Sequence, residues 1–113
     1  MASLPAMSHR TMNRQTSSLF FRKVKIGNNT QIGPNCQFLP PNHPIDHIER
    51  RKPIERCTPI TISEDCWLGG GVTVCPGVTI GDRCIIGAGS VVVKDIPSDS
   101  MAAGNPCRVI RKL

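Results

Sequence analysis

Residues 62–97 read ISEDCW, LGGGVT, VCPGVT, IGDRCI, IGAGSV and VVKDIP, six consecutive hexads. An aliphatic residue opens each hexad, and a small or medium-sized side chain takes the fifth place: Cys66, Val72, Val78, Cys84, Ser90 and Ile96. Repeats this short predict a parallel β-helix, because one hexad cannot bury its apolar face alone and must stack on the next. Three hexads make one triangular coil, so Ile62 and Ile80 are expected to stack at about the 4.8 Å strand spacing.

The six-residue period excludes the common alternatives. An amphipathic helix needs apolar residues at i, i+3, i+4 and i+7, and the run Gly69–Gly71 would cost it about 1 kcal/mol per residue. A hairpin strand or an irregular sandwich strand would not turn every six residues. Gly69, Gly81 and Gly87 each follow the aliphatic residue, which predicts tight corners there that need a residue without Cβ.

Composition bounds the function. A chain of 113 residues is expected to form one domain, and with one Trp, three Phe and no Tyr its core must be aliphatic. The net charge of +6 would suit nucleic acid, but the cations are dispersed and lack stacking aromatics, so nucleic-acid binding is not expected. A phosphorylated cofactor explains the charge as well. No apolar run reaches 18 residues, so we expect no membrane span.

The six cysteines lack any C-x-x-C pair, and no secretory segment precedes them. Cys66 and Cys84 fall on inward places, where a small hydrophobe suffices. We therefore predict reduced thiols in a cytoplasmic protein. No metal site is expected, because His43 and His47 could find a third histidine only in His9 near the N-terminus.

Outside the main repeat the chain divides into four parts. Residues 1–23 hold four cations and no acid, which fits a disordered tail unrelated to the repeat or, alternatively, a mitochondrial presequence. The hexads begin at Ile26 and fill one coil to residue 43. Residues 44–59 carry three prolines and seven charges, so they should leave the solenoid as a loop, where function concentrates. Residues 98–113 read as a turn and a short extended segment.

His43 is the main catalytic candidate, since it closes a coil at the mouth of the predicted loop. An imidazole there could accept the proton of a substrate hydroxyl, although a solvated loop histidine is the plainer interpretation. Asp46 could orient it. Lys94, Arg108 and Arg111 could bind phosphates or could be ordinary surface charges. Trp67, the single indole, should lie near a corner, with core packing as its alternative role.

Several motifs together resemble the maltose, galactoside and nodulation acetyltransferases of the hexapeptide-repeat family. They are HPID from His43, PITI from Pro59, CWLGG from Cys66, PGVTIGD from Pro76, GAGSVV from Gly87, KDIP from Lys94 and GNPCRVIR from Gly104. The resemblance spans residues 24–113. It implies an all-β, left-handed parallel β-helix of about three coils with an extruded loop, and a homotrimer with active sites between subunits.

The resemblance also implies roles for individual residues. The family's general base falls on His43, and its oxyanion donor, a backbone N–H, falls on Gly70. Trp67 matches the indole beside the thioester, and Gly69 and Ala88 match positions along the pantetheine arm of acetyl-CoA. Lys94, Arg108 and Arg111 match residues around the CoA nucleotide. The family's upstream coils and acceptor-binding residues have no counterpart in residues 1–23, which suggests an N-terminally truncated form.

We therefore predict an acetyl-CoA-dependent O-acetyltransferase that acts on a sugar hydroxyl, with no metal. Two alternatives stay open. The chain could be an impaired β-helix remnant that binds CoA or associates with relatives, or it could acylate a non-sugar amine or a serine hydroxyl. The sequence does not identify the acceptor.

Overall fold

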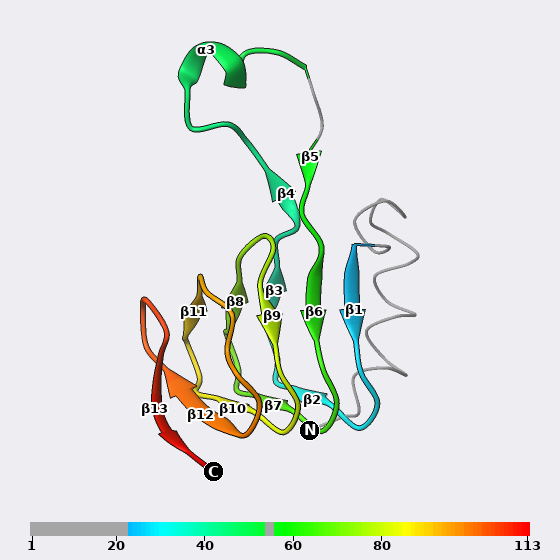
Figure 1. The fold of residues 1–113 in the computed structure, drawn as a ribbon, viewed down its shortest axis with the longest axis vertical. Coiled ribbons are helices and arrows are strands. Elements are labelled where there is room, and N and C mark those ends of the chain that lie inside the picture. Colours follow the sequence, from blue (N-terminus) through cyan, green and yellow to red (C-terminus); the bar gives the residue numbers. More distant parts are fainter. Residues whose placement is uncertain (1–22, 54–55) are drawn as a thin grey trace.

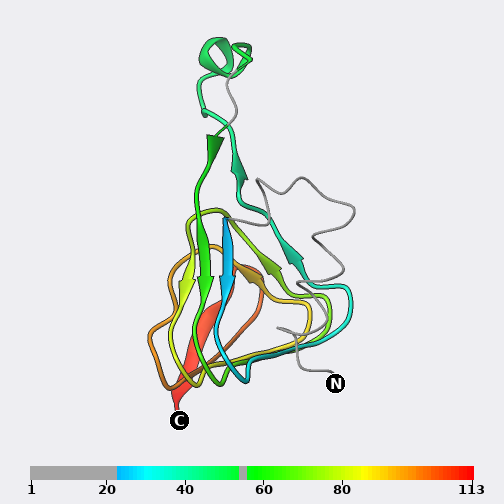
Figure 2. The same cartoon turned by 90° about the vertical axis from the view of Figure 1, so that its right-hand side faces the viewer.

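In a computed structural model the chain is described over residues 23–53 and 56–113, and it winds into three-sided coils stacked along one axis (Figure 1). The tail predicted for residues 1–23 lies outside these ranges, apart from Lys23. Figure 2, which looks along the stack, shows the triangular outline of the coils and the loop that projects from them. The fold is a parallel β-helix, as the hexads predict.

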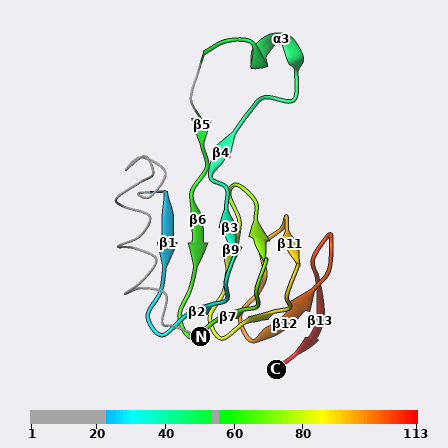
Figure 3. The same ribbon diagram turned by 180° about the vertical axis from the view of Figure 1, so that it is seen from behind.

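Each side of the triangle is one sheet, and we number the three faces in chain order. The first face consists of β1 (Val24–Ile26), β6 (Ile60–Ile62) and β9 (Thr79–Ile80). The second consists of β2 (Gln31–Ile32), β7 (Trp67–Leu68), β10 (Ile85–Ile86), β12 (Ser100–Ala103) and β13 (Arg108–Lys112). The third consists of β3 (Gln37–Phe38), β8 (Thr73–Val74) and β11 (Val91–Val92). Figure 3 shows the stack from behind, with β2 and β7 adjacent.

The strand register confirms the predicted stacking. Ile62 pairs with Ile80, 18 positions on, in parallel strands. Ile26 pairs with Ile62, 36 positions on, so the residues between the first and second coils keep the phase of the repeat. The last coil is two residues shorter, because Ile80 bridges Ile96 and Ile86 pairs with Ala102. Strand β12 therefore continues the stack beyond Pro97, where the sequence predicted only a turn and an extended segment.

The core is the column of inward side chains. All twelve first-place and fifth-place residues of the hexads in 62–97 are buried: Ile62, Cys66, Leu68, Val72, Val74, Val78, Ile80, Cys84, Ile86, Ser90, Val92 and Ile96. Alternate residues of a strand point to opposite faces, so each two-residue strand sends one side chain inward and one outward. The short aliphatic core follows from this geometry.

The turns between strands share a characteristic backbone conformation. In all but two hexads, those with Pro41 and Asp95, the fourth place adopts a left-handed conformation, with φ between 57° and 80° at Asn29, Asn35, Asp65, Gly71, Gly77, Arg83 and Gly89. Glycine, asparagine and aspartate tolerate this region best, which explains most of these residues. The glycines after the aliphatic residue have a different reason from the one the sequence suggested. A Cβ on Gly69 would lie 2.7 Å from the Ala88 nitrogen, and one on Gly81 would lie 2.5 Å from the Ser98 nitrogen. The approach of the next coil, rather than φ, requires glycine there.

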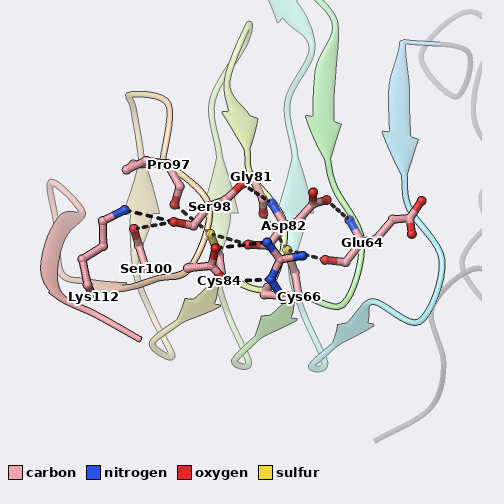
Figure 4. Close-up of polar contacts among 11 residues, drawn as sticks. Glu64, Cys66, Gly81, Asp82, Cys84, Pro97, Ser98, Ser100 and Lys112 are labelled. Atoms are coloured by element: carbon pink, nitrogen blue, oxygen red, sulfur yellow. Dashed lines mark hydrogen bonds and ion pairs between the residues drawn. The ribbon is translucent and has the colours of Figure 1, made fainter.

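Buried polar side chains join successive coils at one corner (Figure 4). The Cys66 thiol donates to the Gly81 carbonyl at 3.0 Å, and the Cys84 thiol donates to the Pro97 carbonyl at 3.1 Å. In the coil below, the Thr30 hydroxyl donates to the Ser63 carbonyl at 2.7 Å. All six cysteines are free thiols. A small donor in these fifth places satisfies backbone carbonyls that the corner would otherwise leave unpaired.

The loop leaves the stack between the third and first faces. Its stem is the antiparallel pair β4 (Pro41–Asn42) and β5 (Arg56–Cys57), so the chain departs three residues before the predicted start at 44. At its tip is one turn of helix, α3 (His47–Arg50), which Asp46 caps by accepting from the Glu49 N–H at 3.0 Å. No helix within residues 23–53 and 56–113 is long and apolar enough to cross a bilayer.

A hairpin closes the C-terminal end. Strand β13 runs antiparallel to β12, and the Leu113 N–H donates to the Asp99 carbonyl at 2.8 Å. Arg83 and Asp99 form a two-pronged ion pair across successive coils, with N–O distances of 2.6 and 3.0 Å. Arg83 has a left-handed φ that a long side chain seldom adopts, and the ion pair holds it at this turn.

Candidate active site

A cleft of about 360 Å³ opens at the corner between the second and third faces. The backbone and mostly apolar side chains of three successive coils line it: Gly33, Pro34, Trp67, Gly69, Gly70, Ile85, Ile86, Gly87 and Ala88. Four of the residues assigned to the site from the sequence, namely Trp67, Gly69, Gly70 and Ala88, therefore meet in one place.

The floor of the cleft is a row of glycines. Gly33, Gly69 and Gly87 follow the inward residue of β2, β7 and β10, so they lie one above another in successive coils. A Cβ on Gly33 would lie 2.6 Å from the Gly70 nitrogen, and one on Gly87 would lie 3.0 Å from the Ala103 Cβ. Glycine at these positions lets successive coils stack closely, and the cleft opens over the row. We call this part of the cleft the glycine trough, and it can hold a linear chain against the backbone.

Trp67 forms one wall of the trough. Its side chain faces outward from β7 and is 48% exposed, so the core-packing alternative is wrong. Above it in register lies Ile85, and above that lies Met101. An exposed indole over an apolar row suits a ligand that is itself partly apolar.

Gly70 supplies the polar group of the cleft. Within the described residues no acceptor takes its N–H, although its carbonyl accepts from the Gly89 N–H at 2.9 Å. The next N–H, that of Gly71, donates to the Pro34 carbonyl at 2.9 Å and is therefore occupied. An N–H that no described residue accepts can stabilise a negative charge that develops in an apolar cleft.

His43 lies at a different corner from the cleft. It follows β4 at the stem of the loop, is exposed, and is absent from the cleft lining. The suggested Asp46–His43 contact is not formed. Asp46 caps α3, and its other oxygen lies 3.9 Å from the His47 Nδ1. The sequence spacing could not reveal this, because the cap of a four-residue helix decides where the carboxylate points.

The three predicted phosphate-binding cations divide between two places. Lys94 is exposed in the turn after β11, at the corner from which the loop also leaves. Arg108 and Arg111 are exposed on β13 at the end of the second face, and Arg111 lies opposite Met101. One chain therefore carries the residues assigned to the site in two separate groups. His43 and Lys94 share one corner, whereas the cleft residues lie at another corner and the two arginines lie on the edge strand of the second face, which ends at that corner.

Sequence reasoning missed five cleft residues, namely Gly33, Pro34, Ile85, Ile86 and Gly87. The signal was present, since Gly87 lies 18 positions after Gly69 and Gly33 lies 36 positions before it. In a three-hexad coil these numbers place all three in one column. Among the described residues no three His, Cys, Asp or Glu side chains gather in a way that could hold a metal ion.

The fold and cleft define a class of protein, the transferases built on hexapeptide coils. The bacterial transferase hexapeptide family of six repeats matches residues 59–94. A galactoside acetyltransferase in complex with coenzyme A superposes with a TM-score of 0.75 and 49% identity, over 79% of this chain and 44% of that one. A maltose O-acetyltransferase from Clostridium difficile 630 superposes with a TM-score of 0.64 and 30% identity, over 93% of this chain and 82% of that one.

Relatives found by sequence are acetyltransferases by name, like the similar structures. The protein named "Putative acetyltransferase YJL218W" of Saccharomyces cerevisiae is 50% identical over 91 residues, which make up 80% of this chain and 46% of the relative. The chain belongs to the hexapeptide-repeat acetyltransferase family, whose fold is the left-handed parallel β-helix. It spans about half the length of the curated relatives that it matches.

Proposed function

We propose that this chain is an O-acetyltransferase that moves the acetyl group of acetyl-CoA to a hydroxyl of a sugar. One observation carries the proposal: Gly70, whose N–H finds no acceptor among the described residues, lines a cleft walled by an exposed indole. Galactoside and maltose acetyltransferases among the similar structures support a sugar acceptor.

The reaction proceeds by direct attack. The acceptor oxygen bonds to the thioester carbonyl carbon while the neutral His43 imidazole takes the hydroxyl proton. The negative charge that develops on the carbonyl oxygen accepts a hydrogen bond from the Gly70 N–H. Collapse of the tetrahedral intermediate breaks the C–S bond, and the departing sulfur takes the proton back from His43. The products are an acetyl ester and CoA, and the neutral imidazole is restored.

A homotrimer brings the two groups of residues together. Because His43 and Gly70 occupy different corners of one chain, a neighbouring copy supplies the His43 that acts at a given cleft. A cyclic arrangement with three copies gives three equivalent sites, each with the loop corner of one subunit beside the cleft of the next. Ile45, which is 98% exposed on the loop, then has an apolar surface to cover it.

The cofactor lies along the glycine trough. Trp67, Gly69 and Ala88 contact its thioester and pantetheine, while Arg108 and Arg111 meet the nucleotide and its phosphates as charge-assisted donors. Lys94 reaches the same phosphates from the neighbouring subunit. The six free thiols suit a reducing compartment, and the proposal places the protein in the cytoplasm.

The test is turnover of acetyl-CoA against a panel of sugars, with His43→Ala and His47→Ala as a matched pair of exposed loop histidines. We expect His43→Ala to lose about 10²–10⁴ in kcat and His47→Ala to keep wild-type activity. Equal activity of the two variants would remove His43 as the general base. Tight CoA binding by calorimetry without turnover of any sugar or amine would instead identify a binding remnant.

A further inference from the structure

The outward side chains of the second face form one row in which the chemistry changes from end to end. Gln31, Trp67, Ile85 and Met101 pair in parallel register, and Arg111 lies opposite Met101 on the edge strand. The row is therefore polar and uncharged at β2, apolar through β7, β10 and β12, and cationic at β13. The glycines of the trough, Gly33, Gly69 and Gly87, lie beside its first three strands, β2, β7 and β10.

Provided that the proposed function holds, this order sets the direction in which acetyl-CoA lies along the row. Phosphates belong at the cationic end, near Arg108 and Arg111, and the apolar middle suits the pantetheine arm. The thioester then lies by Trp67 and the Gly70 N–H. The space left for the sugar is on the β2 side of Trp67, because acetyl-CoA fills the row on the other side.

Gln31 is the side chain that stands there. It faces outward from β2 next to Trp67, and it is exposed. Its carboxamide makes no hydrogen bond to any other described residue of the chain. Gly33 and Pro34, two and three residues further on, line the cleft itself. A carboxamide offers two donors and one acceptor, which suits a sugar with several neighbouring hydroxyls.

We propose that Gln31 contacts the acceptor and determines its specificity, by hydrogen bonding to a hydroxyl beside the one that is acetylated. The residue takes no part in proton transfer and does not touch acetyl-CoA. It selects acceptors with a second hydroxyl within reach over those that lack one.

The chain offers a matched control in Gln37. This residue has the same side chain, is exposed in the same coil and also faces outward, but from the third face, where its row continues through Thr73 and Val91. The cleft lining does not include it. Gln31→Leu and Gln37→Leu thus remove the same amide from two sides of one corner.

The experiment measures kcat and KM for maltose, for a methyl galactoside and for acetyl-CoA with the full-length variants. We expect Gln31→Leu to lower the acceptor kcat/KM about 10-fold while the acetyl-CoA KM and the acetyl-CoA hydrolysis without sugar stay at wild-type values. Gln37→Leu should match the wild type in every constant. The melting temperature of both variants should equal that of the wild type, since both side chains are exposed.

Monodeoxy galactosides identify the hydroxyl. One deoxy position should lower the wild-type kcat/KM and cause no further loss in Gln31→Leu, because the two changes remove the same hydrogen bond. A wild-type protein that acetylates sugars while Gln31→Leu matches Gln37→Leu would overturn the role of Gln31 alone. So would a rise in the acetyl-CoA KM. A wild-type protein that transfers acetyl to no sugar would overturn the proposed function and this inference together.

Discussion

His43 and Gly70 lie at different corners of the triangular coil. Gly70 sits between the second and third faces and lines the cleft, whereas His43 sits where the loop leaves, between the third face and the first. The positions of the other candidates repeat this division, with Lys94 near the loop corner and Trp67 and Ala88 at the cleft. A site that needs both corners must be shared between copies of the chain.

Mixing two inactive variants tests the shared site. His43→Ala lacks the base and Gly70→Pro lacks the N–H, so each alone should lose activity. In a cyclic trimer, random mixing leaves about one site in four with both groups intact, and activity should return to that fraction. If both groups acted within one chain, no mixture would recover.

Folding of the Gly70 variant is controlled in two ways. Gly70→Ala keeps the N–H, and its Cβ would lie 3.4 Å from the Pro34 oxygen, so it should retain activity. Ala88→Phe, which fills the cleft from an exposed position, should complement His43→Ala in the same way as Gly70→Pro does. Failure of both cleft variants to complement, with trimers intact by size-exclusion chromatography, would contradict the shared site.

The close approach of successive coils predicts a large effect from one methyl group. Gly69→Ala places a Cβ 2.7 Å from the Ala88 nitrogen and should lower the free energy of unfolding by about 1–3 kcal/mol. Gly70→Ala should change it by less than about 0.5 kcal/mol. Denaturant unfolding at one fixed protein concentration compares the two, and equal stabilities would contradict the steric explanation of the glycine column.

The Arg83–Asp99 ion pair predicts a pH dependence of stability. The hydrogen bonds from Arg83 hold the pKa of the Asp99 carboxyl below its ordinary value. Asp99 therefore binds its proton at lower pH in the folded chain than in the unfolded chain. The stabilisation is complete above the unfolded pKa of about 3.9 and is lost as the pH falls through the folded pKa.

Melting temperatures of the wild type and Asp99→Asn should accordingly differ at pH 6 and converge at the lowest pH. Both side chains are about half exposed, so the difference should be small and should shrink in 1 M salt. In an Arg83→Gln background the Asp99→Asn change should have no such pH dependence. A difference that persists undiminished in strong acid would rule out the ion pair as its source.

The thiols should react in an order set by burial. Burial raises the pKa of the Cys66 thiol to about 11, and Cys84 is likewise buried in the same corner. Cys57 and Cys75 are only partly buried. Iodoacetamide at pH 8 should therefore modify Cys57 and Cys75 first, because the thiolate is the nucleophile. Peptide mass spectrometry reads the order, and guanidinium should make all six equally reactive. Early labelling of Cys66 would contradict the burial of its thiol between successive coils.

Much of the fold was predictable because the repeat is local and periodic. The pairs Ile62–Ile80 and Ile26–Ile62 follow from counting hexads, and so does the burial of every first and fifth place in residues 62–97. The end of the β-helix was not predictable, because the last coil is two residues shorter and β12 pairs with β10 at an offset of 16. The place where the loop departs also escaped the count, because the β4–β5 pairing begins at Pro41.

The candidate site was predictable in part. Trp67, Gly69, Gly70 and Ala88 came from motifs and do meet in one cleft, while Gly33 and Gly87 could have been found by their spacing from Gly69. The suggested Asp46–His43 contact was wrong, because a helix cap claims the carboxylate. Gln31 has no motif around it, and only its register with Trp67 draws attention to it.

The amino-acid sequence by itself determined the coil, since a six-residue period with an aliphatic opener can bury its apolar side chains in only one way, by stacking on itself. The tertiary structure decided which residues share a corner. The position of a residue around the triangular coil depends on where each turn falls. One shortened coil or one hairpin stem changes that position, and the local sequence pattern does not show the change. For this reason His43 and Gly70, which are 27 residues apart in sequence, lie at opposite edges of the third face.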